Sequence, residues 1–142
     1  RSGGAHIGTL RRHLDECLAA ARGLRASCAP VSDRARAEIA ECAIRVELAR
    51  LLAYRVAWLR GSGQLPNYEV SIVKLIATET HQRLANIMLN AHGLPGMGLG
   101  ASVEAETWGA SYLDMASKTI GQGSSEIQRN VIATRGLGLP RG

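Results

Sequence analysis

The residues best suited to chemistry lie near the C-terminus, where a turn enters a helix between Ile120 and Ala133. Gly121 and Gly123 allow the backbone to come close to a ligand. Ser125 with Gln128 fits a capping box, which marks a helix start. The first turn of a helix presents unpaired N–H groups and a partial positive charge, and both suit phosphates and carbonyl oxygens. The segment therefore predicts either an ordinary capped helix or a helix start that binds an oxygen-rich ligand.

The residue order of this segment resembles the C-terminal signature of the acyl-CoA dehydrogenase family, usually I-Y-E-G-T-S-E-I-Q-R-N-x-I-A. Gly123, the run from Ser125 to Asn130, and Ile132-Ala133 match it, and residues 138–141 close the chain with Gly-Leu-Pro-Arg as the family does. Residues 49–59 are similar to its A-R-L-L-x-Y-x-A-A-W-L helix, and residues 74–79 to its K-L-x-A-S-E segment. The resemblance covers most of the chain. It implies the helical C-terminal domain of a longer protein, without the N-terminal helical domain and the middle β-domain.

The family's catalytic base is missing from its usual place. The glutamate that removes the α-proton of acyl-CoA falls on Gln122, and the tyrosine before it falls on Gly121. An amide cannot accept that proton. Gln122 is therefore expected to act only through its backbone N–H, which in the family hydrogen-bonds the thioester carbonyl, or to be a plain turn residue. Some members carry the base on the first helix of this domain. Counting back from Arg22 places that alternative position before residue 1.

The resemblance also assigns residues around the turn to cofactor and substrate. Ser124 and Glu126 match positions that touch FAD, although ordinary helix capping explains both equally well. Gly123 matches a position beside the acyl-CoA substrate. These three residues and Gln122 form the first half of the expected site.

The second half matches a turn that, in the family, holds the ADP part of the FAD of a neighbouring subunit. Its candidates are Asn90, Gly93 and Gly96, and the glycines and proline of residues 92–100 predict a loop there. Leu94 replaces a family glycine, and Arg22 keeps the arginine of the R-x-x-F-G motif without its phenylalanine and glycine. Two weakened motifs and a lost base favour the alternative of a subunit that has given up part of its site.

The net charge of +5 could suit nucleic acid. However, the arginines of residues 33–60 point around the helix, and no basic stripe is interleaved with aromatic residues. Acidic partners are expected at helical spacing: Glu41 for Arg45, Glu47 for Arg50, and Glu79 for Arg83. A solvated surface or a subunit interface is the better account, and no nucleic-acid binding is expected.

Composition points to one folded domain in the cytoplasm. Of the 142 residues 46% are hydrophobic, enough for a real core, and no apolar run reaches the length of about 20 residues that spans a membrane. The cysteines lack a CxxC spacing and predict buried free thiols: Cys17, Cys28 and Cys42. The four histidines lack metal-ligand spacing and are expected at the surface or an interface. Trp58 and Trp108 are expected in the core.

Helical periodicity marks the following segments: residues 7–27, residues 33–60 capped by Ser32 or Asp33 after Pro30, a helix from Pro66 to Gly93, one or two short helices within 101–119, and a helix from about Ser125 to Arg135. No alternating strand pattern occurs. The expected fold for residues 1–142 is therefore a single all-α domain, an antiparallel, up-and-down four-helix bundle. Residues 39–59 carry two adjoining apolar faces, which predict self-association or pairing with a related chain.

The resemblance implies a function and an alternative. The first is α,β-desaturation of an acyl-CoA thioester, with FAD as hydride acceptor and an electron-transfer flavoprotein as the next carrier. The isolated domain is then expected to be inactive. The alternative is a non-catalytic partner subunit in a homo- or hetero-oligomer with acyl-CoA dehydrogenase chains. An unrelated helical adaptor would explain the helices but not the match over residues 123–133.

Overall fold

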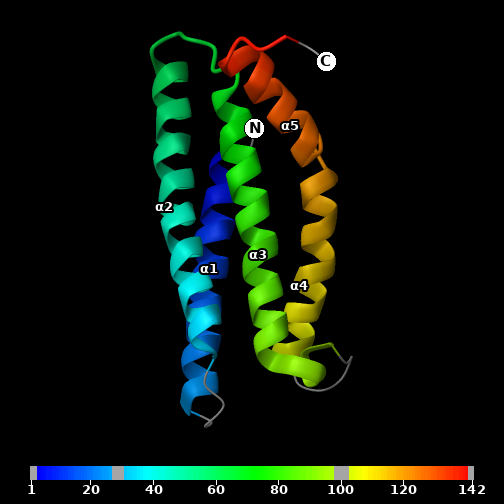
Figure 1. The fold of residues 1–142 in the computed structure, drawn as a ribbon. Helices are drawn as coiled ribbons and strands as arrows, with labels where there is room; N and C mark the ends of the chain where they lie inside the picture. The colour runs from blue at the N-terminus through cyan, green and yellow to red at the C-terminus, as the bar shows by residue number, and fades with distance from the viewer. Residues whose placement is uncertain (1–2, 27–30, 98–102, 141–142) are drawn as a thin grey trace.

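The computed structural model describes residues 3–26, 31–97 and 103–140, and every regular element in these ranges is a helix (Figure 1). In chain order these are α1 (Gly3–Ala26), α2 (Asp33–Gly61), α3 (Glu69–Met97), α4 (Val103–Ile120), α5 (Ser125–Val131) and the π-helix η1 (Ile132–Gly136). Short links make the long helices antiparallel to their neighbours in sequence. The predicted all-α, up-and-down bundle is confirmed.

Helix α3 is the centre of the bundle, because it packs against α1, α2, α4 and α5. The largest fully buried side chains come from three helices: Leu10 and Cys17 of α1, Cys42 and Val46 of α2, and Thr80, Leu84 and Met88 of α3. Burying a leucine or methionine stabilises a fold by roughly 1.5–3 kcal/mol. The apolar residues that repeat at helical spacing along α1 and α2 are the ones that pack against α3.

Among the described residues, one apolar face of α2 is covered by other helices, and the adjoining face is covered only in part. Ile39, Cys42, Val46 and Ala49 are buried against α1 and α3. The adjoining face leaves large side chains exposed: Ile44 at 71%, Leu48 at 45%, Leu51 at 56% and Trp58 at 65%. Trp58 is therefore not the core residue that the sequence predicts. Its helix has more apolar surface than one bundle can cover.

Helix α3 runs further than predicted. It continues through Gly93 and Gly96 to Met97, so the expected stop at Gly93 and the expected loop are wrong for residues 93–97. Each of the two glycines costs the helix only about 1 kcal/mol, whereas Pro95, which has no N–H to donate, is the costlier residue in this stretch. The rest of the expected loop lies at 98–100, outside the described residues. Helix α4 is one continuous helix of 18 residues rather than a short helix or two.

The start of α2 follows the capping rules. Ser32 caps α2, since its Oγ accepts a hydrogen bond from the N–H of Ala35 at 3.2 Å. Pro30 lies outside the described residues. The last helical segment ends near Arg135 as expected, but its C-terminal part is π-helical from Ile132.

A cluster of aromatic and polar side chains joins α1, α3 and α4. The ring of His13 stacks on Trp108 and lies beside His81, with both centroid distances at 5.0 Å. Ser111 Oγ lies 3.2 Å from His13 Nε2. His13 and His81 are buried, which corrects the expectation of surface histidines, because the bundle packs His13 against Trp108 and His81 against His13. The prediction that Trp108 lies in the core is confirmed.

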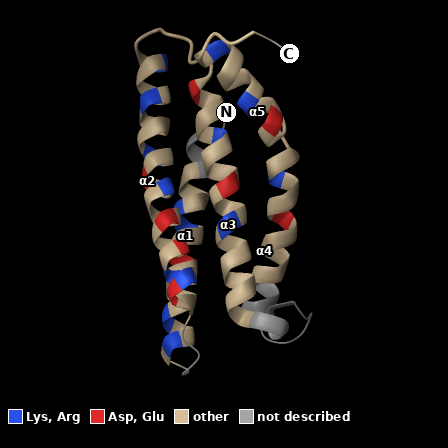
Figure 2. Cartoon of the chain, in the orientation of Figure 1, with Lys and Arg blue, Asp and Glu red and all other residues tan. Residues whose placement is uncertain are grey.

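Basic and acidic residues are distributed along the helices (Figure 2), and two of the three predicted ion pairs form. Arg45 bonds to Glu41 at 3.1 Å and Arg50 to Glu47 at 2.8 Å, as predicted. The expected pair of Glu79 with Arg83 does not form, because both side chains reach other helices. Arg83 bonds to Glu41 of α2 at 2.8 Å, and Glu79 accepts from Arg129 of α5.

Several expectations concern the chain as a whole. Cys17 and Cys42 are buried free thiols, as predicted, and Cys28 lies outside the described residues. Across residues 3–26, 31–97 and 103–140, no helix has the length and apolarity needed to cross a membrane. Within the same ranges, no group of three or more potential ligand residues is placed to hold a metal ion.

Candidate functional site

The turn between α4 and α5 has an unusual backbone. Gln122 has a φ of 59° and Gly123 a φ of 90°, so two successive residues adopt left-handed conformations. Of the described residues other than glycine, Gln122 alone has a positive φ. A non-glycine residue in this region costs on the order of 1–3 kcal/mol and persists only where its surroundings hold it. The turn is therefore a strained element held by neighbouring side chains.

Two side chains from other helices hold this turn. Gln128 of α5 donates from Nε2 to the carbonyl of Gln122 at 3.0 Å. Lys74 of α3 donates from Nζ to the carbonyl of Gly123 at 2.7 Å and to that of Thr119 at 3.3 Å. A hydrogen bond from a charged group contributes about 1.5–3 kcal/mol, which is enough to offset the strain at Gln122.

The turn leaves two backbone donors without a partner among the described residues. Within the described chain, the N–H groups of Gln122 and Gly123 donate no hydrogen bond, whereas the N–H of Gly121 bonds to the carbonyl of Ser117 at 2.9 Å. Two adjacent free N–H groups can stabilise an oxygen that carries negative charge. This is the chemistry expected of the backbone at Gln122.

Of the two glycines in the turn, Gly123 is the one that the backbone requires. A Cβ at position 123 would lie 2.7 Å from Nε2 of Gln128, on a backbone with positive φ. A Cβ at Gly121 would meet only the carbonyl of Ser117, at 3.4 Å. The conformational freedom predicted for both glycines is thus needed at Gly123 alone.

The helix cap is one residue earlier than the capping-box pattern predicts. Ser124 is the N-cap of α5, and its Oγ accepts a hydrogen bond from the N–H of Ile127 at 3.4 Å. Ser125 is buried inside the first turn, and Gln128 reaches back to Gln122 instead. The reason is the left-handed pair before it, which leaves Ser124 as the last extended residue.

Glu126 is exposed in the first turn of α5. Hydrogen bonds from its own backbone N–H and from the Ser124 hydroxyl lower the pKa of its carboxyl group, and the positive charges of Arg129 and Lys74 act in the same direction. Glu126 is therefore an ionised hydrogen-bond acceptor at neutral pH. A group held in this way is poorly suited to serve as a proton donor.

The predicted site residues lie in two separate parts of the structure. Gln122, Gly123, Ser124 and Glu126 lie together at the α4–α5 turn. Asn90 lies 16 residues after Lys74 on α3, about 24 Å along the helix axis at 1.5 Å per residue. Gly93 and Gly96 follow it in the last turns of the same helix. One chain therefore does not bring the two halves of the expected site together.

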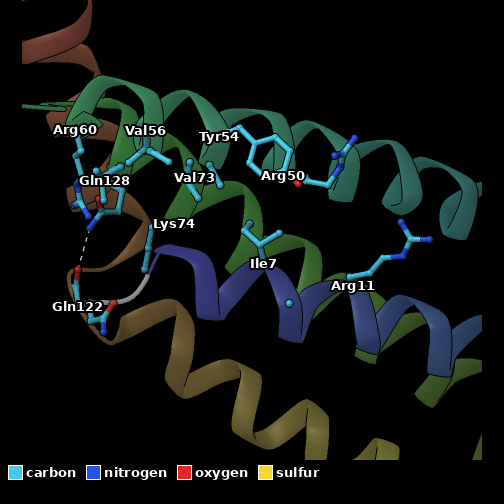
Figure 3. Close-up of a pocket in the computed structure, with 14 residues that line it drawn as sticks. Ile7, Arg11, Arg50, Tyr54, Val56, Arg60, Val73, Lys74, Gln122 and Gln128 are labelled. Carbon is cyan, nitrogen blue, oxygen red and sulfur yellow. Dashed lines mark hydrogen bonds between the residues drawn. The ribbon is translucent and has the colours of Figure 1, made fainter. Parts of the chain in front are cut away.

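Two pockets flank the turn. Gln122 borders a pocket of about 570 Å³ between the start of α1, the end of α2 and the start of α3 (Figure 3). The apolar residues that line it include Ile7, Ala53, Val56 and Val73, and the basic residues are Arg11, Arg50, Arg60 and Lys74. Ser124 and Glu126 border a second pocket of about 530 Å³ with Arg45, Arg83 and Arg129.

The remaining predicted residues border other pockets. Asn90 lines one of about 680 Å³ with Ser32 and Arg83, and its Nδ2 donates to Oδ1 of Asn86 at 3.4 Å. Arg22 lines another of about 730 Å³ with Arg25 and Arg36. Residues of the α4–α5 turn line neither of these two pockets.

Sequence reasoning missed Lys74 as part of the site. Burial lowers the pKa of its ammonium group, while the charges of Glu79 and Glu126 oppose that shift. A signal was present, because the chain has only two lysines and this one lies between the apolar positions Val73 and Ala77. A lysine inside an apolar helical face suggests a buried hydrogen-bonding task.

Comparison with known proteins agrees with the fold. The family model described as "Acyl-CoA dehydrogenase, C-terminal domain" matches residues 2–137. The chain is similar to the probable acyl-CoA dehydrogenase YngJ of Bacillus subtilis (strain 168), with 31% identity over 129 residues, 89% of this chain and 33% of that protein. It spans about a quarter to a third of the length of the curated relatives that it matches first.

Solved structures share the helical arrangement. The structure titled "Tcur3481-Tcur3483 steroid ACAD" matches with a TM-score of 0.78 at 23% identity, covering 96% of this chain and 35% of that one. The structure titled "FAD complex of PigA" matches with a TM-score of 0.73 at 23% identity, again covering 96% and 35%. At this level of identity the similarity establishes the fold.

Proposed function

Because the chain belongs to the acyl-CoA dehydrogenase family, as its C-terminal domain, we propose that it serves in the α,β-desaturation of an acyl-CoA thioester with FAD as hydride acceptor. The observation that carries the proposal is the left-handed turn at Gln122 and Gly123, with two free backbone N–H groups beside a pocket. Such a turn is built to receive an oxygen that gains negative charge.

The residues near the turn fit a flavin cofactor in part. Arg45, Arg83 and Arg129 line the pocket that Ser124 and Glu126 border, together with Glu79. Each arginine is ion-paired with a glutamate, and a hydroxyl beside guanidinium groups suits the phosphate and hydroxyl groups of FAD. The bound cofactor would supply the hydride acceptor. At Gly93 and Gly96 the backbone is helical, so its N–H groups are used within α3. We therefore assign the FAD role to Ser124, Glu126 and the surrounding arginines more firmly than to Gly93 and Gly96.

The turn's own contribution is to the thioester carbonyl. When the α-proton leaves, negative charge moves to the carbonyl oxygen, and the N–H of Gln122 would stabilise it. The side chain of Gln122 cannot take the proton, because an amide has no basic site at neutral pH. The base must then come from another part of the protein or from a partner subunit.

The alternative is a partner subunit of a mixed complex, and one observation favours it. The exposed face of α2 carries four large apolar side chains (Ile44, Leu48, Leu51 and Trp58), with the exposed Arg55 between the last two, and such a face can pair with another chain. The similarity to a steroid acyl-CoA dehydrogenase whose title names two proteins fits such an assembly. In either case we propose pairing with a copy of this chain or a related one, electron transfer onward to an electron-transfer flavoprotein, and a cytoplasmic location suited to free thiols.

The test uses the full-length protein, alone and with any co-purified partner chain. Acyl-CoA thioesters of increasing length, and one with a steroid side chain, are added without oxygen while flavin absorbance is recorded. Desaturation predicts bleaching together with formation of the enoyl thioester. If the protein holds FAD and no thioester bleaches it, the desaturase proposal is wrong for this chain and the partner-subunit role gains support.

A further inference from the structure

We propose that Lys74 is the positioning residue of the α4–α5 turn, holding the N–H of Gln122 where the thioester carbonyl binds. The proposal rests on the function proposed above for that turn. Lys74 lies on α3, whereas the turn joins α4 to α5, so the residue connects the central helix of the bundle to the reacting segment. Figure 3 shows its side chain beside Gln122 and Gln128 at the same end of the pocket.

The contacts of Lys74 enclose the turn from both sides. Its Nζ bonds to the carbonyl of Thr119, in the last turn of α4, and to the carbonyl of Gly123, directly after Gln122. Gln128 bonds the carbonyl of Gln122 itself. Side chains of the protein therefore bind the carbonyls of Thr119, Gln122 and Gly123. The N–H groups of Gln122 and Gly123 have no partner among the described residues.

The charge of Lys74 has an unusual environment. Among the described residues, no carboxylate lies within ion-pair distance of Nζ, although the other lysine, Lys118, pairs with Asp114 at 2.6 Å. A lysine needed only for bundle stability would gain most from a carboxylate partner. Lys74 instead donates two hydrogen bonds, of the three it can make, to carbonyl groups at one turn. This choice of partners indicates that its task is to shape that turn.

The alternatives for Lys74 are weaker. As a general base it would need a free lone pair directed at the substrate, but its Nζ points at two carbonyl oxygens and donates to them. As an anion site it would need its donors free. Positioning uses both observed hydrogen bonds and explains how a glutamine can hold a left-handed φ of 59°.

The experiment compares Lys74→Met with Lys118→Met in the full-length protein. Methionine removes the donor with little change in length, and Lys118 supplies a lysine on α4 that does not touch the turn. Backbone hydrogen exchange is followed by mass spectrometry over residues 119–128. Lys74→Met should speed exchange at least about threefold in this peptide and leave α1 and α2 unchanged, while Lys118→Met should match wild type.

Kinetics provide the second measurement. Lys74→Met should lower kcat by about 10- to 100-fold, the size expected when an oxyanion donor is displaced, and change KM less than about threefold. Lys74→Arg keeps a cationic donor and should recover part of kcat. A merely structural lysine would instead lower the melting temperature and leave kcat per folded molecule intact.

The outcomes separate this proposal from the proposed function. Unchanged exchange over residues 119–128 in Lys74→Met would overturn the positioning role, whatever the activity. Faster local exchange with unchanged kcat would overturn its link to the reaction. If the wild-type protein desaturates no acyl-CoA, the proposed function fails, and the exchange experiment still decides whether Lys74 holds the turn.

Discussion

His13 of α1 stacks on Trp108 of α4 with their ring centroids 5.0 Å apart, and His81 of α3 lies at the same distance on another side. Three helices therefore meet around one imidazole. Burial lowers the pKa of His13, Lys118 and Arg12 lower it further, and Glu16 opposes them. The neutral ring is the form that the bundle accommodates.

We expect the domain to lose stability in mild acid. The folded state binds the His13 proton less readily than the unfolded state, so the free energy of unfolding rises with pH in this range. The His13 contribution is complete above about pH 6.5, the ordinary histidine pKa, and is lost as the pH falls toward the lowered value. Urea unfolding between pH 5 and 8 measures this slope. His13→Gln should flatten it. A slope that His13→Gln leaves unchanged would contradict the assignment.

Gly123→Ala should destabilise the chain by about 1–3 kcal/mol, because it adds a Cβ to a backbone with positive φ and places it against Gln128. Gly63→Ala is the matched control, since Gly63 has a φ of +77° and open space around it. Gly63→Ala should lower the free energy of unfolding by less than Gly123→Ala does. Gly8→Ala, inside α1 with nothing within 4 Å, should stabilise by roughly 0.5–1 kcal/mol. Chemical denaturation gives all three values, and an equal cost at Gly123 and Gly63 would show that Gln128 does not constrain the turn.

Gln122→Ala in the full-length protein should leave desaturation nearly intact, because only the backbone N–H of this residue is expected to act. Gln122→Glu is the stronger test. It places a carboxylate at the position of the family base and should rescue a variant whose own base has been removed elsewhere. If the site on this chain is empty, Gln122→Glu should have no effect. A large fall in kcat for Gln122→Ala, with unchanged assembly and melting temperature, would show that the side chain itself takes part.

Leu51→Asp and Trp58→Asp should weaken association without lowering the stability of the fold. Both side chains are more than half exposed on α2, so a charge there disrupts an intermolecular contact and leaves the core intact. Leu113→Asp, at a residue 72% exposed on α4, is the control. Sedimentation velocity over a range of concentrations measures the effect. A wild-type protein that stays monomeric and captures no related chain would refute the proposed interface.

Cys17 and Cys42 should resist thiol reagents in the folded protein. Burial raises the pKa of the Cys17 thiol to about 12, with a smaller contribution from Cys42, so almost no thiolate forms near neutral pH. Burial also raises the pKa of Cys42. An aromatic disulfide reagent should label at most one of the three cysteines in native protein and all three in guanidinium chloride. Rapid native labelling of two or more would indicate that the α1–α2 interface opens readily.

The sequence was sufficient for features that depend on local spacing. The apolar repeat of residues 33–60 defines α2 to within a residue, since only a helix places positions three and four apart on one face. Ser32 caps that helix because a hydroxyl before the first turn accepts a free N–H. The ordered match from Gly123 to Ala133 was enough to indicate the family. Each of these depends on neighbours within a few residues along the chain.

The tertiary structure decided which distant side chains meet. Glu79 and Arg83 have the spacing of an ion pair, yet Arg83 reaches Glu41 and Glu79 accepts from Arg129, because α2 and α5 pack against opposite flanks of α3. Lys74 joins the turn only because α3 passes behind it. The left-handed φ of Gln122 likewise depends on bonds from two other helices. Such contacts depend on the crossing angles and distances at which whole helices pack together. The spacing of side chains within one helix does not specify these quantities.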